Sequence, residues 1–230
     1  MLNHLVELRF GTKFGIGILV FKIKSFKLIF WDFDGVIKDS VEVKTQAFFQ
    51  LFEPFGSVVA EKVREHHEAH GGMSRFEKLP IYLQWAGIET SQSTVSEYCE
   101  QFSQRVLQGV IDAPWVPGVE RYLRNNSNQQ TFFVVSATPQ DELEHILHAL
   151  NLTKCFAEVY GAPIRKQDAI SETLLARELD ARDCLMIGDA QADLDAAVAN
   201  QVPFLLRRHS SNTKVFATYT GSSVEDFTTL

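Results

Sequence analysis

The chain has 230 residues, enough for one α/β core with a small inserted domain and too many for a disulfide-stapled miniprotein. Its 45% hydrophobic and 22% charged residues are typical of globular proteins and exclude long-range disorder and fibrous classes. The formal net charge of −7 disfavours a protein that binds nucleic acid regardless of sequence, because such proteins need a basic face to neutralise phosphates. We therefore expect no nucleic-acid partner.

The cysteines and the N-terminus indicate the compartment. Three cysteines, none close enough to another in sequence for a C-x-x-C motif, favour a reducing compartment, and we expect a cytoplasmic protein. The apolar run at residues 14–21 is far shorter than the ~20 residues of a membrane helix, and no signal cleavage site follows it. We interpret residues 1–25 as an N-terminal extension, either an extra strand or a poorly ordered leader, and expect no membrane partner.

The predicted elements fall into two blocks. The first strand covers residues 26–31, an apolar run that is typical of a strand buried on both faces of a parallel sheet. Amphipathic helices follow at residues 41–52, 57–70, 74–85 and 94–108, separated by proline and glycine. From residue 117 helices and strands alternate. The predicted helices lie at 118–124, 139–150, 167–179 and 190–200, and the predicted strands at 131–135, 157–160, 184–187 and 203–206.

Repeated β–α units predict a parallel sheet with right-handed crossovers. The helical block interrupts this sheet after its first strand, so the predicted fold is α/β, a Rossmann-like parallel sheet core with an inserted all-helical cap domain. We expect the core to comprise residues 26–40 and 114–230 and the cap residues 41–113, with hinges near residues 39–41 and 113–117.

Polar side chains follow four of the predicted strands. Ligands of open α/β sheets bind beyond the carboxyl ends of the strands, so charges at these positions carry more weight than charges elsewhere. In chain order, the strand ends carry Asp32 and Asp34, then Ser136, then Lys166, and finally Asp189 and Asp193. The fold therefore predicts that these groups surround one point.

This combination of groups suits phosphoryl transfer. Clustered carboxylates repel one another unless a divalent cation compensates, and hard oxygen ligands with room for water favour Mg²⁺. The cation and Lys166 would neutralise a phosphoryl group and let a carboxylate attack it as a nucleophile. Each residue alone is commonplace, since an Asp before a helix often caps it and a Ser after a strand often makes a turn. Their occurrence at four strand ends in order points to a catalytic site.

With these motifs the sequence resembles the haloacid dehalogenase-like hydrolase superfamily, specifically its phosphatases with a helical cap, similar to phosphoglycolate phosphatases and β-phosphoglucomutases. The resemblance covers about residues 27–208. The segment at residues 32–40 matches the first family motif, Ser136 the second, Lys166 the third, and Gly188-Asp189 with Asp193 the fourth.

The resemblance implies roles for the acidic residues. Asp32 would be the nucleophile that forms an aspartyl-phosphate, and Asp34 the general acid that protonates the leaving oxygen and then the base that activates water. Mg²⁺ would be held by the Asp32 carboxylate, the Asp34 backbone carbonyl and Asp189, with Asp193 as a second ligand or orienting group. Members that cleave carbon–halogen bonds lack the second carboxylate, so Asp34 favours phosphate esters.

The resemblance also implies a phosphate-binding set. Ser136 and Lys166 would hold the phosphoryl oxygens, assisted by backbone N–H groups around Gly35 and Ala137. Electrostatic stabilisation by such donors is usually the largest catalytic term.

The cap segment at residues 70–78 is the candidate for substrate recognition. Gly72, Ser74 and Arg75 would contact the substrate there, with Arg75 pairing with a second phosphate or a carboxylate. Alternatively, the glycines end one helix, Ser74 caps the next, and Arg75 is exposed. A similar loop holds the distal phosphate in β-phosphoglucomutases, but Lys44 stands where those enzymes carry a histidine, which disfavours mutase activity.

We interpret two further groups of charged or titratable residues as structural rather than functional. We interpret His66, His67 and His70 as a solvated helix face and residues 207–209 as a surface end of the last strand. A phosphonate-cleaving enzyme would need a Schiff-base lysine in the cap, and nothing in the sequence distinguishes one.

The sequence thus predicts a Mg²⁺-dependent phosphatase that hydrolyses a small phosphorylated metabolite, a sugar phosphate or a phosphoglycolate-like compound, through an aspartyl-phosphate. The alternatives are a β-phosphoglucomutase-like phosphosugar mutase and a non-catalytic module that binds a phosphorylated ligand. The expected partner is a small phosphorylated substrate, and the expected assembly is a monomer or weak homodimer.

Overall fold

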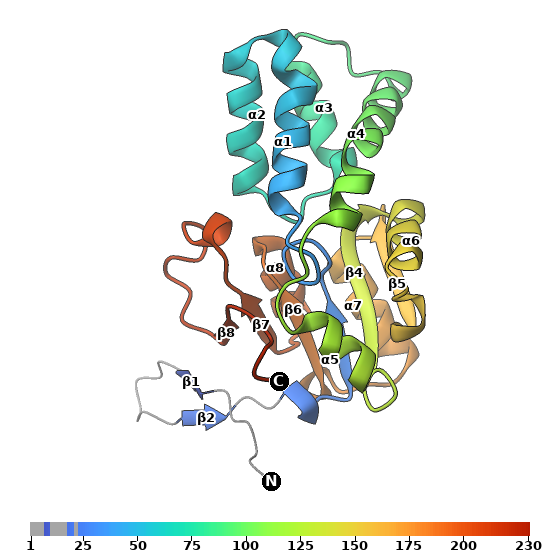
Figure 1. Cartoon of the computed structure of the whole chain (residues 1–230), viewed down its shortest axis with the longest axis vertical. Coiled ribbons are helices and arrows are strands. Elements are labelled where there is room, and N and C mark those ends of the chain that lie inside the picture. The colour runs from blue at the N-terminus through green and yellow to red at the C-terminus, as the bar shows by residue number, and fades with distance from the viewer. Residues whose placement is uncertain (1–6, 10–17, 21–22) are drawn as a thin grey trace.

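The computed structural model describes residues 7–9, 18–20 and 23–230. Its main feature is a six-stranded sheet in which every neighbouring pair is parallel, with the order β5-β4-β3-β6-β7-β8 (Figure 1). The strands are β3 (Leu28–Trp31), β4 (Thr131–Pro139), β5 (Glu158–Ala162), β6 (Cys184–Gly188), β7 (Phe204–Arg207) and β8 (Ser223–Val224). The chain builds outwards from β3 to β5 and then returns to the other side of β3, so its switch point lies at β3 and β6.

Helices cover both faces of this sheet. On one face, Ile29 and Trp31 of β3 pack in one hydrophobic cluster with α5 (Val119–Asn126) and α6 (Gln140–Ala149). On the other, Leu28 and Phe30 pack in a second cluster with α7 (Lys166–Ala176) and α8 (Gln191–Ala199). The alternation explains why β3 is apolar at every position.

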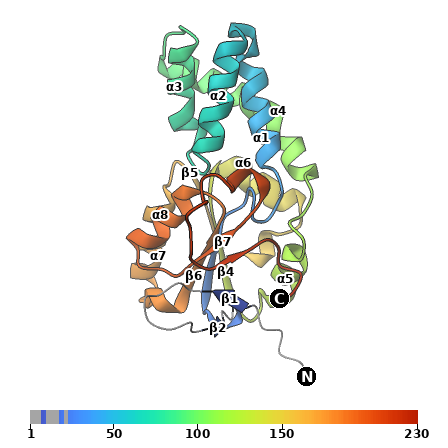
Figure 2. The ribbon, with the colours of Figure 1, turned by 90° about the vertical axis from the view of Figure 1, so that its left-hand side faces the viewer.

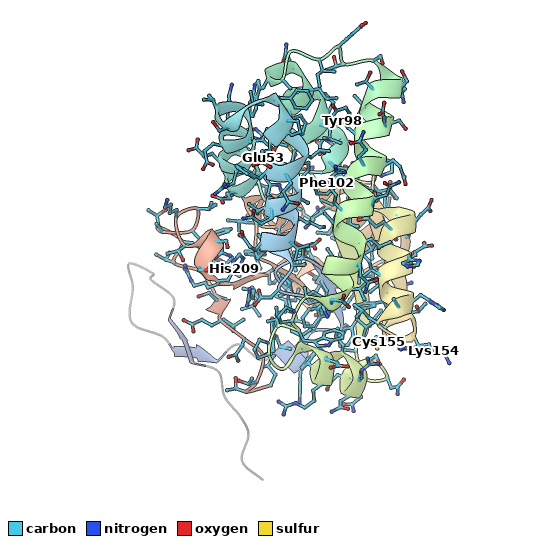
Figure 3. The ribbon with its side chains drawn as sticks, turned by 45° about the horizontal axis from the view of Figure 1, so that its top comes forward. Glu53, Tyr98, Phe102, Lys154, Cys155 and His209 are labelled. Atoms are coloured by element: carbon cyan, nitrogen blue, oxygen red, sulfur yellow. The ribbon has the colours of Figure 1, made fainter. Side chains whose placement is uncertain are left out.

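Four helices stand above the carboxyl ends of the strands (Figures 1 and 2). They are α1 (Val41–Phe52), α2 (Ser57–Ala69), α3 (Arg75–Trp85) and α4 (Gln92–Asp112), and we call them the helical insertion. Aromatic rings fill its interior: Phe48 of α1 stacks on Phe102 of α4, which is labelled in Figure 3, with ring centroids 3.9 Å apart. The predicted fold class, a Rossmann-like parallel sheet with an all-helical block after the first strand, is confirmed.

Two segments connect the insertion to the sheet, and they run side by side. The Asp39 N–H donates to the Pro114 carbonyl at 2.8 Å, and the Val116 N–H donates to the Ile37 carbonyl at 3.1 Å. These are the segments where the sequence predicts hinges. The domain boundaries remain a prediction.

Several element ends differ from the prediction. The last helix of the insertion runs four residues further than expected, to Asp112. Helix α7 ends at Ala176 rather than near residue 179, where the sequence predicts its end. Glu178, just beyond Ala176, has a φ of 51°. Strand β4 continues past Ser136 to Pro139. Short 3₁₀ turns connect the elements: η1 (Ile23–Ser25), η2 (Glu53–Phe55), η3 (Thr153–Cys155), η4 (Ala181–Asp183) and η5 (Ser210–Asn212).

The predicted N-terminal extension is described only in part. β1 (Glu7–Arg9) pairs antiparallel with β2 (Ile18–Val20), and most of residues 1–25 lies outside the described residues, so the interpretation of this segment as an extension stays a prediction. Within the described part of the chain, no helix combines the length and the apolar character needed to cross a membrane.

Candidate active site

The carboxyl ends of three adjacent strands bring the predicted motifs together. β3 pairs with β4 on one side and with β6 on the other, so Asp32 and Asp189, which follow β3 and β6, lie near Ser136 of β4. The loop after β3 then approaches β6 very closely. Gly35 has a φ of 76°, and a Cβ added there would lie 2.1 Å from Asp189 Oδ2. Only glycine allows this approach and this backbone conformation.

Three buried carboxylates form a cluster at this edge. One oxygen each of Asp32, Asp189 and Asp193 lies within 4.8 Å of the others. The Lys166 Nζ lies 2.8 Å from Asp32 Oδ1 and 2.5 Å from Asp193 Oδ1. The second Asp193 oxygen accepts the backbone N–H groups of Asp189 and Ala190 at 3.2 and 3.0 Å. The start of α8 thus holds Asp193 rigidly.

The pKa values of all three carboxyl groups are raised, which indicates that the cluster lacks positive charge. Burial, and then the charge of Asp193, raise the pKa of Asp32 to about 7, although Lys166 opposes them. Burial likewise raises the pKa values of Asp189 and Asp193. Buried carboxylates that a single lysine only partly compensates are hard oxygen donors suited to a divalent cation. The donor set therefore fits Mg²⁺.

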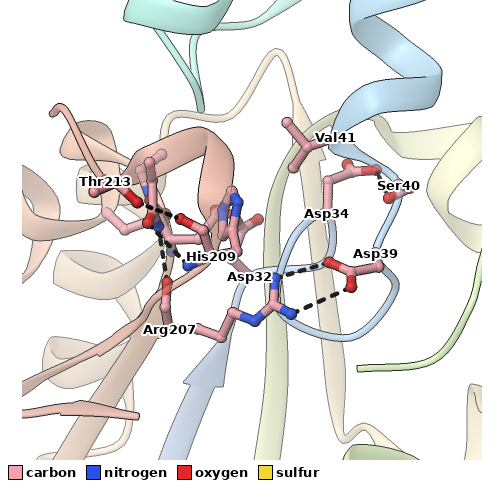
Figure 4. A network of polar contacts seen from close by, with 12 residues as sticks. Asp32, Asp34, Asp39, Ser40, Val41, Arg207, His209 and Thr213 are labelled. Carbon is pink, nitrogen blue, oxygen red and sulfur yellow. Dashed lines mark hydrogen bonds and ion pairs between the residues drawn. The ribbon is translucent and has the colours of Figure 1, made fainter. Parts of the chain in front are cut away.

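The Asp34 carboxylate faces a different set of groups. Ser40 Oγ donates to one of its oxygens at 2.6 Å (Figure 4). Thr138 Oγ1 donates to the other oxygen at 3.2 Å, and Lys44 forms an ion pair with that oxygen. Burial alone would raise the pKa of Asp34, but Lys44 and these hydroxyls hold it below its ordinary value. Asp34 is therefore held in its ionised form, outside the three-carboxylate cluster.

The predicted phosphate-binding residues lie beside the nucleophile candidate. Ser136 is buried, and its Oγ accepts the Thr138 N–H at 3.1 Å. Ser136, Ala137 and Lys166 all line a cavity that also contains Asp32. This end of the cavity can hold an anion between a hydroxyl and an ammonium group.

The cavity lies between the sheet and the helical insertion. Its volume is about 80 Å³, room for only a few water-sized groups. The insertion contributes Lys44, Phe48, His67 and Lys78 to its walls. Gly72 lies at its edge with a φ of 80°, and a Cβ added there would be 2.9 Å from the Ala192 Cβ on α8. The glycine thus lets this loop of the insertion touch the sheet domain.

The other predicted cap residues have protein partners. Arg75 donates two hydrogen bonds to Glu142 of α6, at 2.8 and 2.6 Å, and one to Ser103. The alternative that Arg75 is exposed is wrong, since only 5% of its surface is accessible. Ser74 lies outside the small cavity and caps α3, because the Glu77 carboxylate accepts its N–H at 3.0 Å and its O–H at 2.8 Å.

The segment after β7 contributes contacts that sequence reasoning missed. His209 Nε2 lies 2.8 Å from Asp189 Oδ2, and the Asn212 side chain donates to the Asp189 carbonyl at 2.9 Å. The prediction that residues 207–209 form a surface end is wrong, because Arg207 is buried and forms an ion pair with Asp39 at 2.8 Å (Figure 4). Ligands of open α/β sheets bind beyond the carboxyl ends of the strands, so giving weight to the polar residues that follow β7 would have identified this segment.

The histidines of α2 lie in three different environments. His67 is buried and lines the cavity, so the prediction of a solvated face is wrong for this residue. His66 Nδ1 lies 3.1 Å from the Tyr82 hydroxyl, whereas His70 is exposed. Within the described ranges, Asp32, Asp189 and Asp193 are the one group of three or more side chains placed to hold a metal ion.

Comparison with known proteins agrees with this geometry. Residues 29–206 match the family model described as haloacid dehalogenase-like hydrolase. No curated protein matches the chain.

Solved structures share the fold at low sequence identity. A predicted phosphoglycolate phosphatase from Haemophilus somnus is 18% identical, with a TM-score of 0.69 over 90% of this chain and 97% of that chain. CbbY from Rhodobacter sphaeroides, solved with xylulose 1,5-bisphosphate, is 13% identical, with a TM-score of 0.69 over 88% of this chain and 95% of that one. A β-phosphoglucomutase from Clostridium difficile is 20% identical, with a TM-score of 0.67 over 89% and 93%.

Proposed function

Because the chain belongs to the haloacid dehalogenase-like hydrolase family, we propose that it is a phosphatase that hydrolyses a small phosphorylated metabolite through an aspartyl-phosphate. The observation that carries the proposal is the position of Asp32 in a small cavity beside Lys166 and Ser136. A carboxylate nucleophile, an ammonium group and a hydroxyl in one small space suit attack on a phosphoryl group.

The reaction has two displacements. An Asp32 oxygen attacks phosphorus, the bond from phosphorus to the ester oxygen breaks, and the leaving oxygen takes a proton from Asp34. Because Lys44 favours the ionised form of Asp34, this carboxylate must first take up that proton from solvent or from the substrate phosphate. Water then attacks the phosphorus of the aspartyl-phosphate, Asp34 accepts a proton from that water, and inorganic phosphate leaves with Asp32 restored. The ionised Asp34 favoured by Lys44 is the form that the second displacement requires.

The surrounding groups hold the phosphoryl oxygens. Lys166 and Ser136 bind them, and the insertion above the cavity excludes bulk water from the intermediate. Asp32, Asp189 and Asp193 would hold Mg²⁺, with the Asp34 carbonyl as a further ligand. When bound, the ion supplies positive charge that reduces the repulsion between the nucleophile and the phosphoryl oxygens.

The cavity and the structural neighbours support a small substrate. The cavity of about 80 Å³ suits a compact phosphate ester, and a larger cavity of about 430 Å³ shares Ser136 and Lys166 with it. Neighbours described as a phosphoglycolate phosphatase and as a complex with xylulose 1,5-bisphosphate support a small phosphorylated metabolite. Gly72 and Arg75 remain proposed substrate contacts through their position at the cavity, whereas Ser74 contributes by starting α3.

A panel of phosphate monoesters, assayed for release of inorganic phosphate with Mg²⁺ and with chelator, tests the proposal. We expect turnover with Mg²⁺, none with chelator, and none in Asp32→Asn, whose circular dichroism should match the original protein. Turnover by Asp32→Asn, or the failure of every ester, would contradict the proposal.

The second candidate function is a phosphosugar mutase, favoured by the similarity to β-phosphoglucomutase. The product separates the two activities. A mutase converts β-glucose 1-phosphate to glucose 6-phosphate without accumulating phosphate, whereas water attack on the intermediate releases phosphate. A non-catalytic phospho-ligand module would give one slow turnover and no steady release.

A further inference from the structure

Four cationic side chains line the cavity, and one of them lacks an acidic partner. Lys44 pairs with Asp34, Lys166 pairs with Asp32 and Asp193, and Arg75 pairs with Glu142. Lys78 of α3 forms no ion pair with any carboxylate in the part of the chain that the structure describes. Its charge therefore has no carboxylate in direct contact, and Glu77 and Asp34 offset it only in part.

The surroundings of Lys78 make this lack of a counter-ion costly. Its exposed fraction is 1%, and its Nζ has one hydrogen-bond partner, His67 Nδ1 at 2.9 Å. Burial, and then the nearby charge of Lys44, lower the pKa of Lys78 to about 7. A cation removed from water is strongly unfavourable unless an anion accompanies it. An ammonium group has three N–H donors, so two remain for a ligand in the cavity.

His67 is arranged to assist the lysine. Its ring is buried, and burial lowers its pKa well below the ordinary value, so the ring is neutral. When Nδ1 accepts a hydrogen bond from the ammonium group, the ring proton resides on Nε2. His67, whose side chain lines the same cavity, then carries an N–H donor at Nε2.

Lys78 and the phosphate-binding residues come from opposite walls of the cavity. Ser136 and Lys166 belong to the sheet domain, whereas Lys78 and His67 belong to the helical insertion. A ligand whose phosphoryl group lies at Lys166 therefore directs its other end towards the insertion. Arg75 is less suited to that end, because both Glu142 oxygens already occupy its guanidinium group.

We propose that Lys78, together with His67, binds a second anionic group of the substrate, so that the preferred substrate is a short phosphate monoester carrying a carboxylate or a second phosphate. This inference rests on the proposed function and specifies its substrate class. Both anions accept charged hydrogen bonds from an ammonium group, and matched substrates distinguish them.

Two pairs of substrates test the role of the anion. 2-Phosphoglycolate and ethyl phosphate differ by a carboxylate, and propane-1,3-diol bisphosphate and propyl phosphate differ by a second phosphate. We expect at least about a 10-fold higher kcat/KM for the member of one pair that carries the second anion, and Lys78→Met should reduce this preference by about 10- to 100-fold. The variant should lose less kcat/KM for ethyl phosphate and propyl phosphate than for their partners, because these esters lack the group that Lys78 would bind.

Controls separate binding from a structural role. Lys62→Met removes an exposed lysine of α2 that lies over the Trp85 ring, and should leave the preference unchanged. Lys78→Arg keeps the charge and should retain part of the preference. Binding of 2-phosphoglycolate and of the bisphosphate to Asp32→Asn, with and without Lys78→Met, gives a second readout that needs no turnover.

The outcomes are distinguishable. Equal rates for the two members of each pair in the original protein, or a loss in Lys78→Met that is equal for both, would overturn the inference and leave the proposed function standing. If no ester is hydrolysed, the proposed function fails, and the binding measurement on Asp32→Asn still decides whether Lys78 recognises an anion. His67→Gln provides a second test should Lys78→Met fail to fold, and we expect a smaller loss of the same preference.

Discussion

Arg75 of α3 and Glu142 of α6 join the helical insertion to the sheet domain through two parallel hydrogen bonds, and both side chains are less than one-tenth exposed. The Arg75 guanidinium also lies 4.6 Å from the centre of the Phe102 ring. Lys44 makes a second bridge, from α1 to Asp34 and Thr138. These polar contacts hold the insertion against the sheet in the form seen here.

Removing one partner of the Arg75–Glu142 pair should destabilise the protein. Arg75→Met leaves a buried carboxylate without a counter-ion, and we expect a loss of about 3 kcal/mol in the free energy of unfolding. The double variant with Glu142→Met should recover most of it, because no charge then remains buried. Urea denaturation measures both. Arg182→Met breaks a highly exposed pair and should change little. A single variant as stable as the original would contradict the interpretation.

The buried charge of Lys78 should make the protein less stable at low pH. Its pKa is about 7 in the folded protein and 10.5 in the unfolded chain, so the unfolded chain binds the extra proton between these values. The cost of folding therefore grows as pH falls from about 10 to 7 and is constant below 7. We expect Lys78→Met to be more stable than the original protein, by more at pH 6.5 than at pH 9. Denaturant unfolding at the two pH values measures this difference.

A lower stability of Lys78→Met would contradict this prediction. If Lys78→Met is the less stable protein at pH 6.5, the ammonium group contributes to folding and is not an uncompensated charge. Lys62→Met is the matched control and should not alter the comparison between the two pH values.

Lys44 should set the pH at which Asp34 works. Burial raises the pKa of Asp34, and the Lys44 charge with the Ser40 and Thr138 hydroxyls brings it below the ordinary value. Lys44→Met removes the largest lowering contribution, so the acidic limb of the kcat profile should move to higher pH. Steady-state rates from pH 4.5 to 8 measure the shift. An unchanged limb would mean that Asp34 does not control the rate in that range.

Magnesium should stabilise the folded protein through the carboxylate cluster. An ion that binds only the folded state raises the unfolding temperature with its concentration, and chelator should reverse the effect. Asp189→Asn should abolish the Mg²⁺-dependent rise in Tm, which a thermal scan detects without any substrate. Asp195→Asn, an exposed position on the same helix as Asp193, should keep the full rise. A rise that persists in Asp189→Asn would indicate a nonspecific ion effect.

His209 should act on the cation through Asp189. Its Nε2 lies 2.8 Å from the Asp189 carboxylate and can fix the orientation of that group. Such supporting contacts contribute about 10- to 100-fold to metal affinity, so His209→Ala should weaken Mg²⁺ binding by that factor. Calorimetric titration measures it, and His209→Gln should restore part of the affinity if orientation is the cause. Full affinity in His209→Ala would assign the histidine a packing role instead.

The sequence could predict features whose signals are local. β3 is apolar at every position and ends at Asp32, so both the strand and its polar end are visible in one short segment. Helices α2, α3 and α4 begin within two residues of the predicted positions, because Gly56, Ser74 and Ser91 mark their starts. The parallel topology then brings Asp32, Ser136 and Asp189 to one edge of the sheet.

The remaining features depend on contacts between distant segments. Arg75 and Glu142 are 67 positions apart, and nothing in residues 70–78 indicates that the guanidinium meets a core helix. Lys78 and His67 have the residue types of a solvated face, yet the packing of α2 and α3 on α1 buries both. The spacing of residues along one helix shows on which face of the helix each side chain lies. Tertiary packing then decides which other element contacts that face.

The ion pair between Arg207 and Asp39 determines where the insertion can pivot. Asp39 is the penultimate residue before α1, and Arg207, at the end of β7, also donates to the Glu225 carbonyl at 3.2 Å (Figure 4). The connection from β3 to α1 is thereby held, as far as Asp39, by the end of β7 and by the segment at Glu225. If the insertion rotates against the sheet, we expect this connection to bend after Asp39, because Arg207, 168 positions later in the chain, holds that residue.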